Sequence, residues 1–150
     1  MIFFETDDLR NDKIYLSLTG TGEAVPERKW VPGYSFDICL TDGTKIGFCN
    51  FRVDNSELTK YCGNIGYGID EKYRGHHYSA EASKLLLKLA EKHGLKYVLI
   101  NCEPDNSASN RICRLLNAEF IKTVDIPKDH EMYQQGMRQM NIYKLEIRSK

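Results

Sequence analysis

The sequence has no excess of charge of either sign, because 21 Lys and Arg residues balance 21 Asp and Glu residues. Nucleic-acid coats and proteins that bind anionic membranes need a basic surplus, so the balance argues against both classes of partner. No apolar run approaches the ~20 residues that cross a bilayer. Acidic side chains follow the apolar residues 2–4 at once, so we expect no signal peptide.

The cysteines are not spaced as in a disulfide framework or a metal site. The count is odd, and no two cysteines stand at C-x-x-C spacing, so neither a disulfide framework nor a zinc knuckle is indicated. The scattered Cys and His positions also disfavour any other metal site. We therefore expect a reduced, cytoplasmic protein that binds no metal. The five cysteines are Cys39, Cys49, Cys62, Cys102 and Cys113.

The length and composition suit a folded domain. The chain has 150 residues, of which 41% are apolar and 28% are charged, an ordinary globular mixture. A chain of this size buries roughly two thirds of its extended surface, which is enough for a hydrophobic core. We expect a single domain that spans residues 1–150.

Strand patterns dominate the first half of the chain. The Asp42-Gly43 pair between two alternating segments is typical of a hairpin turn. Residues 19–34 hold several glycines and prolines and predict a long loop. Strands are predicted at residues 12–18, 35–40, 45–53 and 61–69, the last weakened by three glycines.

Helix patterns separate shorter strands in the second half. Residues 79–93 are apolar on one helical face and charged on the other, and Gly94 stands where a helix usually ends. A second helix is expected after Asp105 or Asn106, either of which can cap it, with a left-handed end at Asn117. The order of elements predicts an α+β fold. Strands are predicted at residues 97–102, 120–126 and 140–147, with a polar loop before the last.

Residues 69–79 lead from a strand through a tight loop into the clearest helix. The first N–H groups of a helix lack partners within it, and the helix dipole adds positive charge there. Such a start suits an anion as large as a diphosphate, and Arg74 can add a bidentate contact. A plain strand-to-helix turn gives the same pattern, so these residues alone leave both interpretations open.

Two motifs resemble those of the GCN5-related N-acetyltransferase (GNAT) family. Residues 74–79 are similar to its Arg/Gln-x-x-Gly-x-Gly/Ala motif, with His77 where the family usually has Gly and Ser79 where it has Gly or Ala. Residues 106–109 resemble its Asn-x-x-Ser/Ala element, especially in the branch that includes the ribosomal-protein alanine acetyltransferases. Residues 116–120 resemble the Leu-Gly-Phe end of the following helix.

The resemblance covers about residues 43–126. It implies a single-domain GNAT-like fold, with a mixed, mostly antiparallel sheet of about six to seven strands flanked by helices. It also implies an enzyme that transfers an acetyl group from acetyl-CoA, its co-substrate, to a primary amine by direct attack in a ternary complex.

The resemblance places acetyl-CoA, the acetyl donor, at the strand–loop–helix segment of residues 69–79 and between the fourth and fifth strands. The pantetheine arm would slot between the fourth and fifth strands beside the small Gly66 and Gly68, bonded by the backbone of Ile69 and the side chain of Asn106. Asn106 suits a plain helix cap equally well. The residues implied to hold the diphosphate are Arg74, Gly75, His76, His77, Tyr78 and Ser79.

Amide formation needs a polarised thioester carbonyl and an acid for the leaving thiolate. A fixed backbone N–H near Ile69 would polarise the carbonyl. Many family members place a tyrosine acid in the last helix, where this chain has Cys113; a thiol can donate a proton, but packing is the favoured role for a small buried residue. Ser109, nearer the helix start, is a second candidate donor or a plain surface serine.

No general base is evident. His76 and His77 titrate in a suitable range, but the motif places them at the diphosphate. Bound water would suffice for an amine that arrives partly deprotonated. The residues considered for holding a water near the amine are Tyr67, Asn64, Tyr133 and Tyr143, with packing favoured for the tyrosines.

The resemblance to the family gives least information about the site that binds the acceptor amine. The usual helix pair between the first two strands is replaced by residues 19–34, whose Trp30 either walls the acceptor pocket, together with Tyr67, or anchors the loop. The expected partner is a small-molecule or protein amine, with no nucleic acid and no membrane, and a homodimer is left open. A non-catalytic acyl-CoA-binding module is the alternative function, motivated by His77 and Cys113.

Overall fold

The structure is a computed structural model that describes residues 3–25, 27, 31–54 and 59–147. Seven strands and four α-helices lie within these residues, which confirms the predicted α+β class. The strands are β1 (Ile14–Gly22), β2 (Gly33–Leu40), β3 (Lys45–Arg52), β4 (Ile65–Ile69), β5 (Tyr97–Cys102), β6 (Glu119–Asp125) and β7 (Gln139–Glu146). The helices are α1 (Thr59–Cys62), α2 (Tyr78–Lys92), α3 (Ser107–Leu115), α4 (Glu131–Gln134) and a 3-10 turn, η2 (Glu71–Tyr73).

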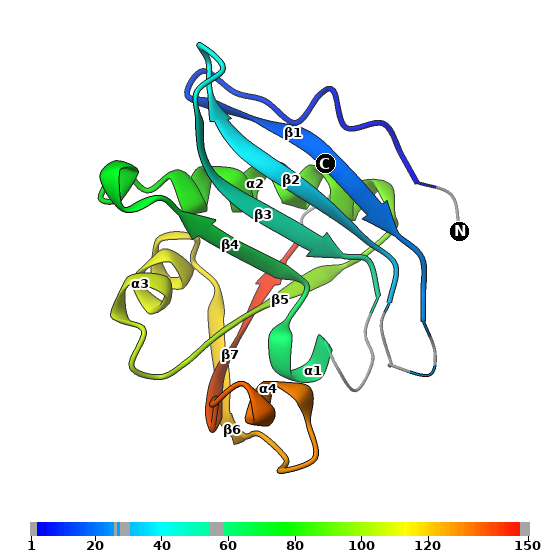
Figure 1. Cartoon of the computed structure of the whole chain (residues 1–150), viewed down its shortest axis with the longest axis vertical. Helices are drawn as coiled ribbons and strands as arrows, with labels where there is room; N and C mark the ends of the chain where they lie inside the picture. The colour runs from blue at the N-terminus through cyan, green and yellow to red at the C-terminus, as the bar shows by residue number, and fades with distance from the viewer. Residues whose placement is uncertain (1–2, 26, 28–30, 55–58, 148–150) are drawn as a thin grey trace.

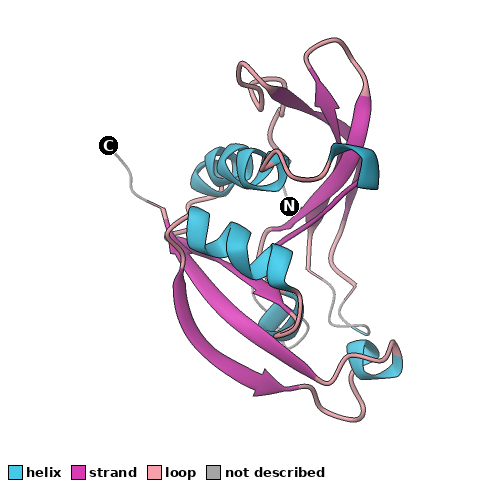
Figure 2. Ribbon diagram, turned by 90° about the vertical axis from the view of Figure 1, so that its left-hand side faces the viewer, coloured by secondary structure: helices cyan, strands magenta, loops and turns pink. Residues whose placement is uncertain are grey.

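The strands are divided between two antiparallel sheets, ordered β1-β2-β3-β4 and β5-β7-β6 (Figure 1). Helices α2 and α3 pack in the angle between the sheets (Figure 2). The sheets are tied where β4 begins: the Asn64 N–H donates to the Leu99 carbonyl at 2.7 Å, and the Leu99 N–H donates to Asn64 Oδ1 at 2.8 Å. From this junction β4 and β5 diverge toward α3, which leaves a gap between the two sheets (Figure 1).

The amphipathic α2 supplies the centre of the core, as its sequence predicts. Its residues Leu85, Leu86 and Leu89 are at most 2% exposed, and each such burial stabilises the fold by about 1.5–3 kcal/mol. They pack against buried residues of both sheets, among them Phe36, Phe51, Val98 and Ile100. Gly94 takes the predicted left-handed end, at φ 78°.

The first hairpin is longer than predicted. Residues 19–22 continue β1 and residues 33–34 begin β2, because Gly20 pairs with Ser35 and Gly22 with Gly33. A register shift after Leu18 breaks the alternation on which the sequence prediction depended. The predicted loop of residues 19–34 therefore loses residues 19–22 and 33–34 to the two strands. Trp30 lies outside the described residues.

The predicted strand at residues 61–69 is also shorter. Its first part forms α1, and Gly63, at φ 77°, turns the chain into β4. A Cβ at Gly63 would lie 2.8 Å from the Leu99 carbonyl oxygen, so the glycine also permits the close approach of β5. The polar loop before β7 contains α4, whose first turn is capped by His130 Nδ1, 3.1 Å from the Met132 nitrogen.

Candidate functional site

The loop between β4 and α2 has two left-handed residues, Gly75 at φ 92° and His77 at φ 61°. His77 stands at the N-cap of α2, and its carbonyl accepts the Ala80 N–H at 3.1 Å. Left-handed backbone is accessible to glycine and costs other residues roughly 1–2 kcal/mol. His77 thus adopts the backbone shape for which a glycine is suited, and its side chain is exposed.

The start of α2 presents its first N–H groups to a cavity. Helix geometry leaves the amides of Tyr78 and Ser79 without partners within the helix, whereas the Ala80 N–H is bonded to the His77 carbonyl. Tyr78 and Ser79 both line the cavity, and Ser79 is only 8% exposed. Arg74 is exposed on the same loop, and its Nε donates to the Ile69 carbonyl at 3.0 Å. Positive charge and N–H donors therefore gather at the end of β4, as an anion site requires.

The free edge of β4 faces the gap between the sheets. The Asp70 backbone N–H donates to the Ile46 carbonyl at 2.8 Å, and the Arg52 backbone N–H donates to the Asn64 carbonyl at 2.7 Å. The even-numbered residues of β4 and its two flanking residues therefore form the hydrogen bonds to β3. In an antiparallel pair the intervening residues point their N–H and C=O groups the other way. The N–H groups of Tyr67 and Ile69 are thus directed toward the gap.

A cavity of about 420 Å³ fills the space between β4, the following loop and α3. It brings together nine residues predicted for the site from the sequence. These are Tyr67, Ile69, Arg74, Gly75, His77, Tyr78, Ser79, Asn106 and Ser109. Gly68, which was expected beside the pantetheine arm, also lines the cavity, together with four residues that were not expected from the sequence: Tyr73, Ala108, Arg111 and Ile112. Of these, Arg111 is exposed and adds a second guanidinium to the cavity. The helical spacing of residues after Asn106 would have indicated that Arg111 lies near this site.

Asn106 fulfils the cap role that the sequence allowed. Its Oδ1 accepts the Ser109 N–H at 3.1 Å, at the start of α3. Asn106 is exposed and also lines the cavity, so a pantetheine contact remains a prediction beside the observed cap.

Tyr67 and Ser109 meet inside the cavity, where their hydroxyl oxygens lie 2.8 Å apart. Burial raises the pKa of the Tyr67 phenol, although the Ser109 hydrogen bond works in the opposite direction. The phenol therefore stays protonated at neutral pH. A protonated hydroxyl pair at this place can pass a proton to a group in the gap.

Cys113 is fully buried and does not line the cavity. A side-chain hydrogen bond with Cys102, together with burial, raises the pKa of the Cys113 thiol. Cys102 lies at the end of β5 and is 4% exposed. The same hydrogen bond lowers the pKa of its thiol. The packing role favoured for Cys113 fits this geometry.

The other candidates occupy structural positions. Tyr143 is 5% exposed and donates to Asn110 Oδ1 at 2.7 Å, and the guanidinium carbon of Arg138 lies 3.7 Å from the Tyr133 ring centroid. The Asn64 side chain bonds the backbone of Leu99 and Arg52. His76 is exposed and does not line the cavity.

The glycines of β4 have a different explanation from the predicted one. A Cβ at Gly66 would lie 2.9 Å from Asn50 Oδ1, and a Cβ at Gly68 would lie 2.6 Å from the Phe48 ring. Both missing side chains would point to the outer face of the sheet, because Gly66 pairs with Asn50 and Gly68 with Phe48. Side chains of β3 therefore require these glycines.

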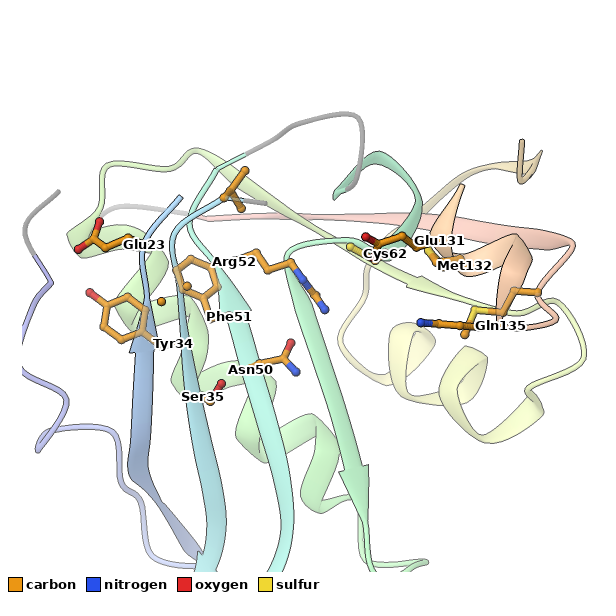
Figure 3. Close-up of a pocket in the computed structure, with 14 residues that line it drawn as sticks. Glu23, Tyr34, Ser35, Asn50, Phe51, Arg52, Cys62, Glu131, Met132 and Gln135 are labelled. Atoms are coloured by element: carbon orange, nitrogen blue, oxygen red, sulfur yellow. The ribbon is translucent and has the colours of Figure 1, made fainter. Parts of the chain in front are cut away.

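A second cavity, of about 510 Å³, lies between the ends of β2 and β3, α1 and the segment around α4 (Figure 3). Polar and apolar side chains both line it. Among them are Tyr34, Ser35, Asn50, Phe51, Arg52, Cys62, Glu131, Met132, Gln135 and Met137. It shares no lining residue with the first cavity.

Comparison with known families identifies the fold and its chemistry. Residues 12–119 match the family described as the acetyltransferase (GNAT) domain. The chain belongs to the GNAT family. This confirms the acetyltransferase class inferred from the two motifs, with acetyl-CoA as the co-substrate.

Solved GNAT structures share the fold at low sequence identity. RimL, a ribosomal L7/L12 α-N-protein acetyltransferase, aligns with a TM-score of 0.59 at 19% identity, over 79% of this chain and 72% of RimL. The microcin C7 self-immunity acetyltransferase MccE, in complex with acetyl-CoA and AMP, aligns with a TM-score of 0.59 at 21% identity, over 81% and 63%. An acetyltransferase from Salmonella typhimurium that modifies the N-terminal serine of L7/L12 aligns with a TM-score of 0.58 at 20% identity, over 77% and 64%.

The chain spans less than two thirds of the length of the second and third of these proteins. A search of curated proteins found no match. Among the described helices, none is long and apolar enough to cross a membrane. Across residues 3–25, 27, 31–54 and 59–147, no group of three or more His, Cys, Asp or Glu side chains is arranged to hold a metal ion.

Proposed function

We propose that this GNAT domain transfers the acetyl group of acetyl-CoA directly to a primary amine. The observation that carries the proposal is the single cavity in which the start of α2, the free edge of β4 and the start of α3 meet. The diphosphate binds the amides at the start of α2 together with Arg74. The pantetheine arm runs along the edge of β4 toward the junction of the two sheets.

The GNAT reaction needs a donor for the thiolate that leaves. The amine nitrogen attacks the thioester carbonyl carbon, the new C–N bond forms, and the C–S bond then breaks. The N–H of Ile69, directed into the gap, stabilises the developing oxyanion. Ser109 donates its hydroxyl proton to the CoA sulfur and is reprotonated by Tyr67, 2.8 Å away. The proton lost by the amine passes to solvent, and Tyr67 takes a proton back from solvent, so both hydroxyls are restored.

The acceptor enters from the second cavity. Tyr67 projects to the core face of β4, with Cys49 as its partner in β3, whereas Asn50 and Arg52 project to the outer face. Donor and acceptor would therefore approach β4 from opposite sides and meet at its free edge. This arrangement supports a ternary complex.

Initial-rate kinetics test the direct mechanism. Varying acetyl-CoA at several fixed amine concentrations is expected to give intersecting double-reciprocal lines, because both substrates bind before transfer. Mass spectrometry after incubation with acetyl-CoA alone is expected to show no acetylated cysteine, since the pKa of Cys113 is raised and both Cys113 and Cys102 are buried. Parallel lines with an acetyl adduct that disappears on adding amine would replace this mechanism with a covalent one.

A further inference from the structure

Asn50 and Arg52 lie two residues apart on the outer face of β3. Their neighbours Cys49 and Phe51 point to the core and are 1% and 0% exposed. Figure 3 shows both polar side chains projecting from β3 toward β4 in the second cavity. The cavity therefore has two polar groups at a fixed spacing on one rigid strand.

The Asn50 amide oxygen is buried without a hydrogen-bond partner in the part of the chain that the structure describes. Leaving such an acceptor unpaired costs about 1–3 kcal/mol. Gly66 lets this oxygen approach β4, since a Cβ there would lie only 2.9 Å from it. An amide oxygen accepts hydrogen bonds, so its missing partner is an N–H donor.

Arg52 places a guanidinium in the same cavity. Its Nη1 donates to the Gly63 carbonyl at 3.3 Å, and this bond holds the guanidinium in place. A guanidinium has five N–H donors in one plane, so further donors remain on the same group. Burial raises the pKa of the Cys62 thiol, and the positive charge of Arg52 partly offsets this effect. A carboxylate is the small group that matches a guanidinium best. Glu131 lines the same cavity, so both signs of charge are present.

The remaining wall is apolar. Val31, Met132 and Met137 contribute to it, and methionine adapts to side chains of different shape. A ligand that fills this cavity therefore needs an apolar body as well as its two polar ends.

We propose that the acceptor is a free amino acid with an apolar side chain. Its amino group donates to Asn50 Oδ1, its carboxylate binds Arg52, and its side chain packs against the methionine-lined wall. This inference deepens the proposed function, on which it rests, by giving the class of amine that is acetylated.

Calorimetric titration of the CoA-bound protein tests the site without relying on turnover. The probes are L-methionine, L-leucine and L-phenylalanine, each paired with its carboxamide, which keeps the amine and removes the carboxylate. We expect each amino acid to bind at least about tenfold more tightly than its carboxamide. Arg52→Gln removes that preference, whereas Asn50→Leu weakens acid and carboxamide alike. Arg10→Gln, a surface arginine over the Tyr15 ring, is the matched control and changes neither affinity.

Equal affinity for acid and carboxamide in the unmodified protein overturns the inference, and this comparison needs no variant to fold. An unchanged preference in folded Arg52→Gln also overturns it, as does a methionyl peptide amide that binds as tightly as methionine. The two proposals fail in different ways. If the amino acids bind with the stated preference but neither they nor any neutral amine is acetylated, the proposed function fails; if a neutral amine is acetylated and no amino acid is acetylated or bound, the acceptor class is wrong.

Discussion

The hydroxyls of Tyr67 on β4 and Ser109 on α3 lie 2.8 Å apart, in the cavity where the two sheets diverge. This pair connects the free edge of β4 to the start of the helix that Asn106 caps. Because burial raises the pKa of Tyr67, the pair keeps its protons at neutral pH. We propose this pair as the group that protonates the leaving thiolate.

Replacing Ser109 by alanine is expected to lower kcat for amine acetylation by about a hundredfold, since positioned acids contribute 10²–10⁴. The KM for acetyl-CoA should change little, because the hydroxyl acts on the sulfur as it leaves. Ser107→Ala, at the exposed first residue of the same helix, is the control. Equal rates for the two variants would remove Ser109 from the mechanism.

Arg74→Glu should weaken CoA binding at least tenfold, about 1.4 kcal/mol. The change replaces a guanidinium that bonds Ile69 with a carboxylate that repels the diphosphate. Lys72→Glu reverses the same charge two residues earlier, at a side chain that lies over the Tyr73 ring, and should have a smaller effect. Calorimetric affinity that is unchanged in Arg74→Glu would move the diphosphate elsewhere.

Gly75→Val should weaken CoA binding with little loss of folding stability. A Cβ at Gly75 would meet no atom within 4 Å outside the adjacent residues, so the main cost of valine is the left-handed backbone at φ 92°. Gly20→Val is a matched control, because Gly20 also has open space around it but no positive φ. The account of the loop is wrong if both variants bind CoA as the unmodified protein does.

Stability should fall with acid through the His93–Tyr34 contact. The Tyr34 hydroxyl accepts the Phe4 N–H at 2.8 Å and lies 2.7 Å from His93 Nε2, so it can donate to the neutral ring. Burial lowers the pKa of His93. Below about pH 6.5 the unfolded chain takes up this proton more readily than the folded one, so stability is lost as pH falls through the lowered pKa.

The measurement is the midpoint of thermal unfolding between pH 7.5 and pH 5. His93→Gln should reduce the fall in this midpoint on acidification, whereas His76→Gln, at an exposed loop residue, should not. An identical pH dependence in both variants would show that His93 does not contribute to it.

The sequence predicted what depends on local pattern. The apolar face of α2, the Asn106 cap and the turn at Gly94 each follow from side chains near one another in the chain. The cavity between β4 and α3 gathers residues of the two motifs because each motif lies between the end of a strand and the start of a helix. Its residues are therefore brought together by the order of the elements.

Features that depend on pairing between distant segments were missed. The extension of β1 to Gly22 depends on the register with β2, and the glycines of β4 are required by Asn50 and Phe48 of β3. The second cavity combines β3 with α4, a helix of four residues inside a predicted loop. No local pattern places Asn50 and Met132 in the same cavity.

The release of CoA thiol from acetyl-CoA, followed with and without amines, tests the central claim most directly. We expect release that depends on the amine and equals the amount of N-acetyl product formed. The panel should include apolar amino acids and neutral primary amines, so that the result does not depend on the acceptor class. Tight CoA binding without amine-dependent release on any member of the panel would contradict the enzyme and support a non-catalytic acyl-CoA-binding module.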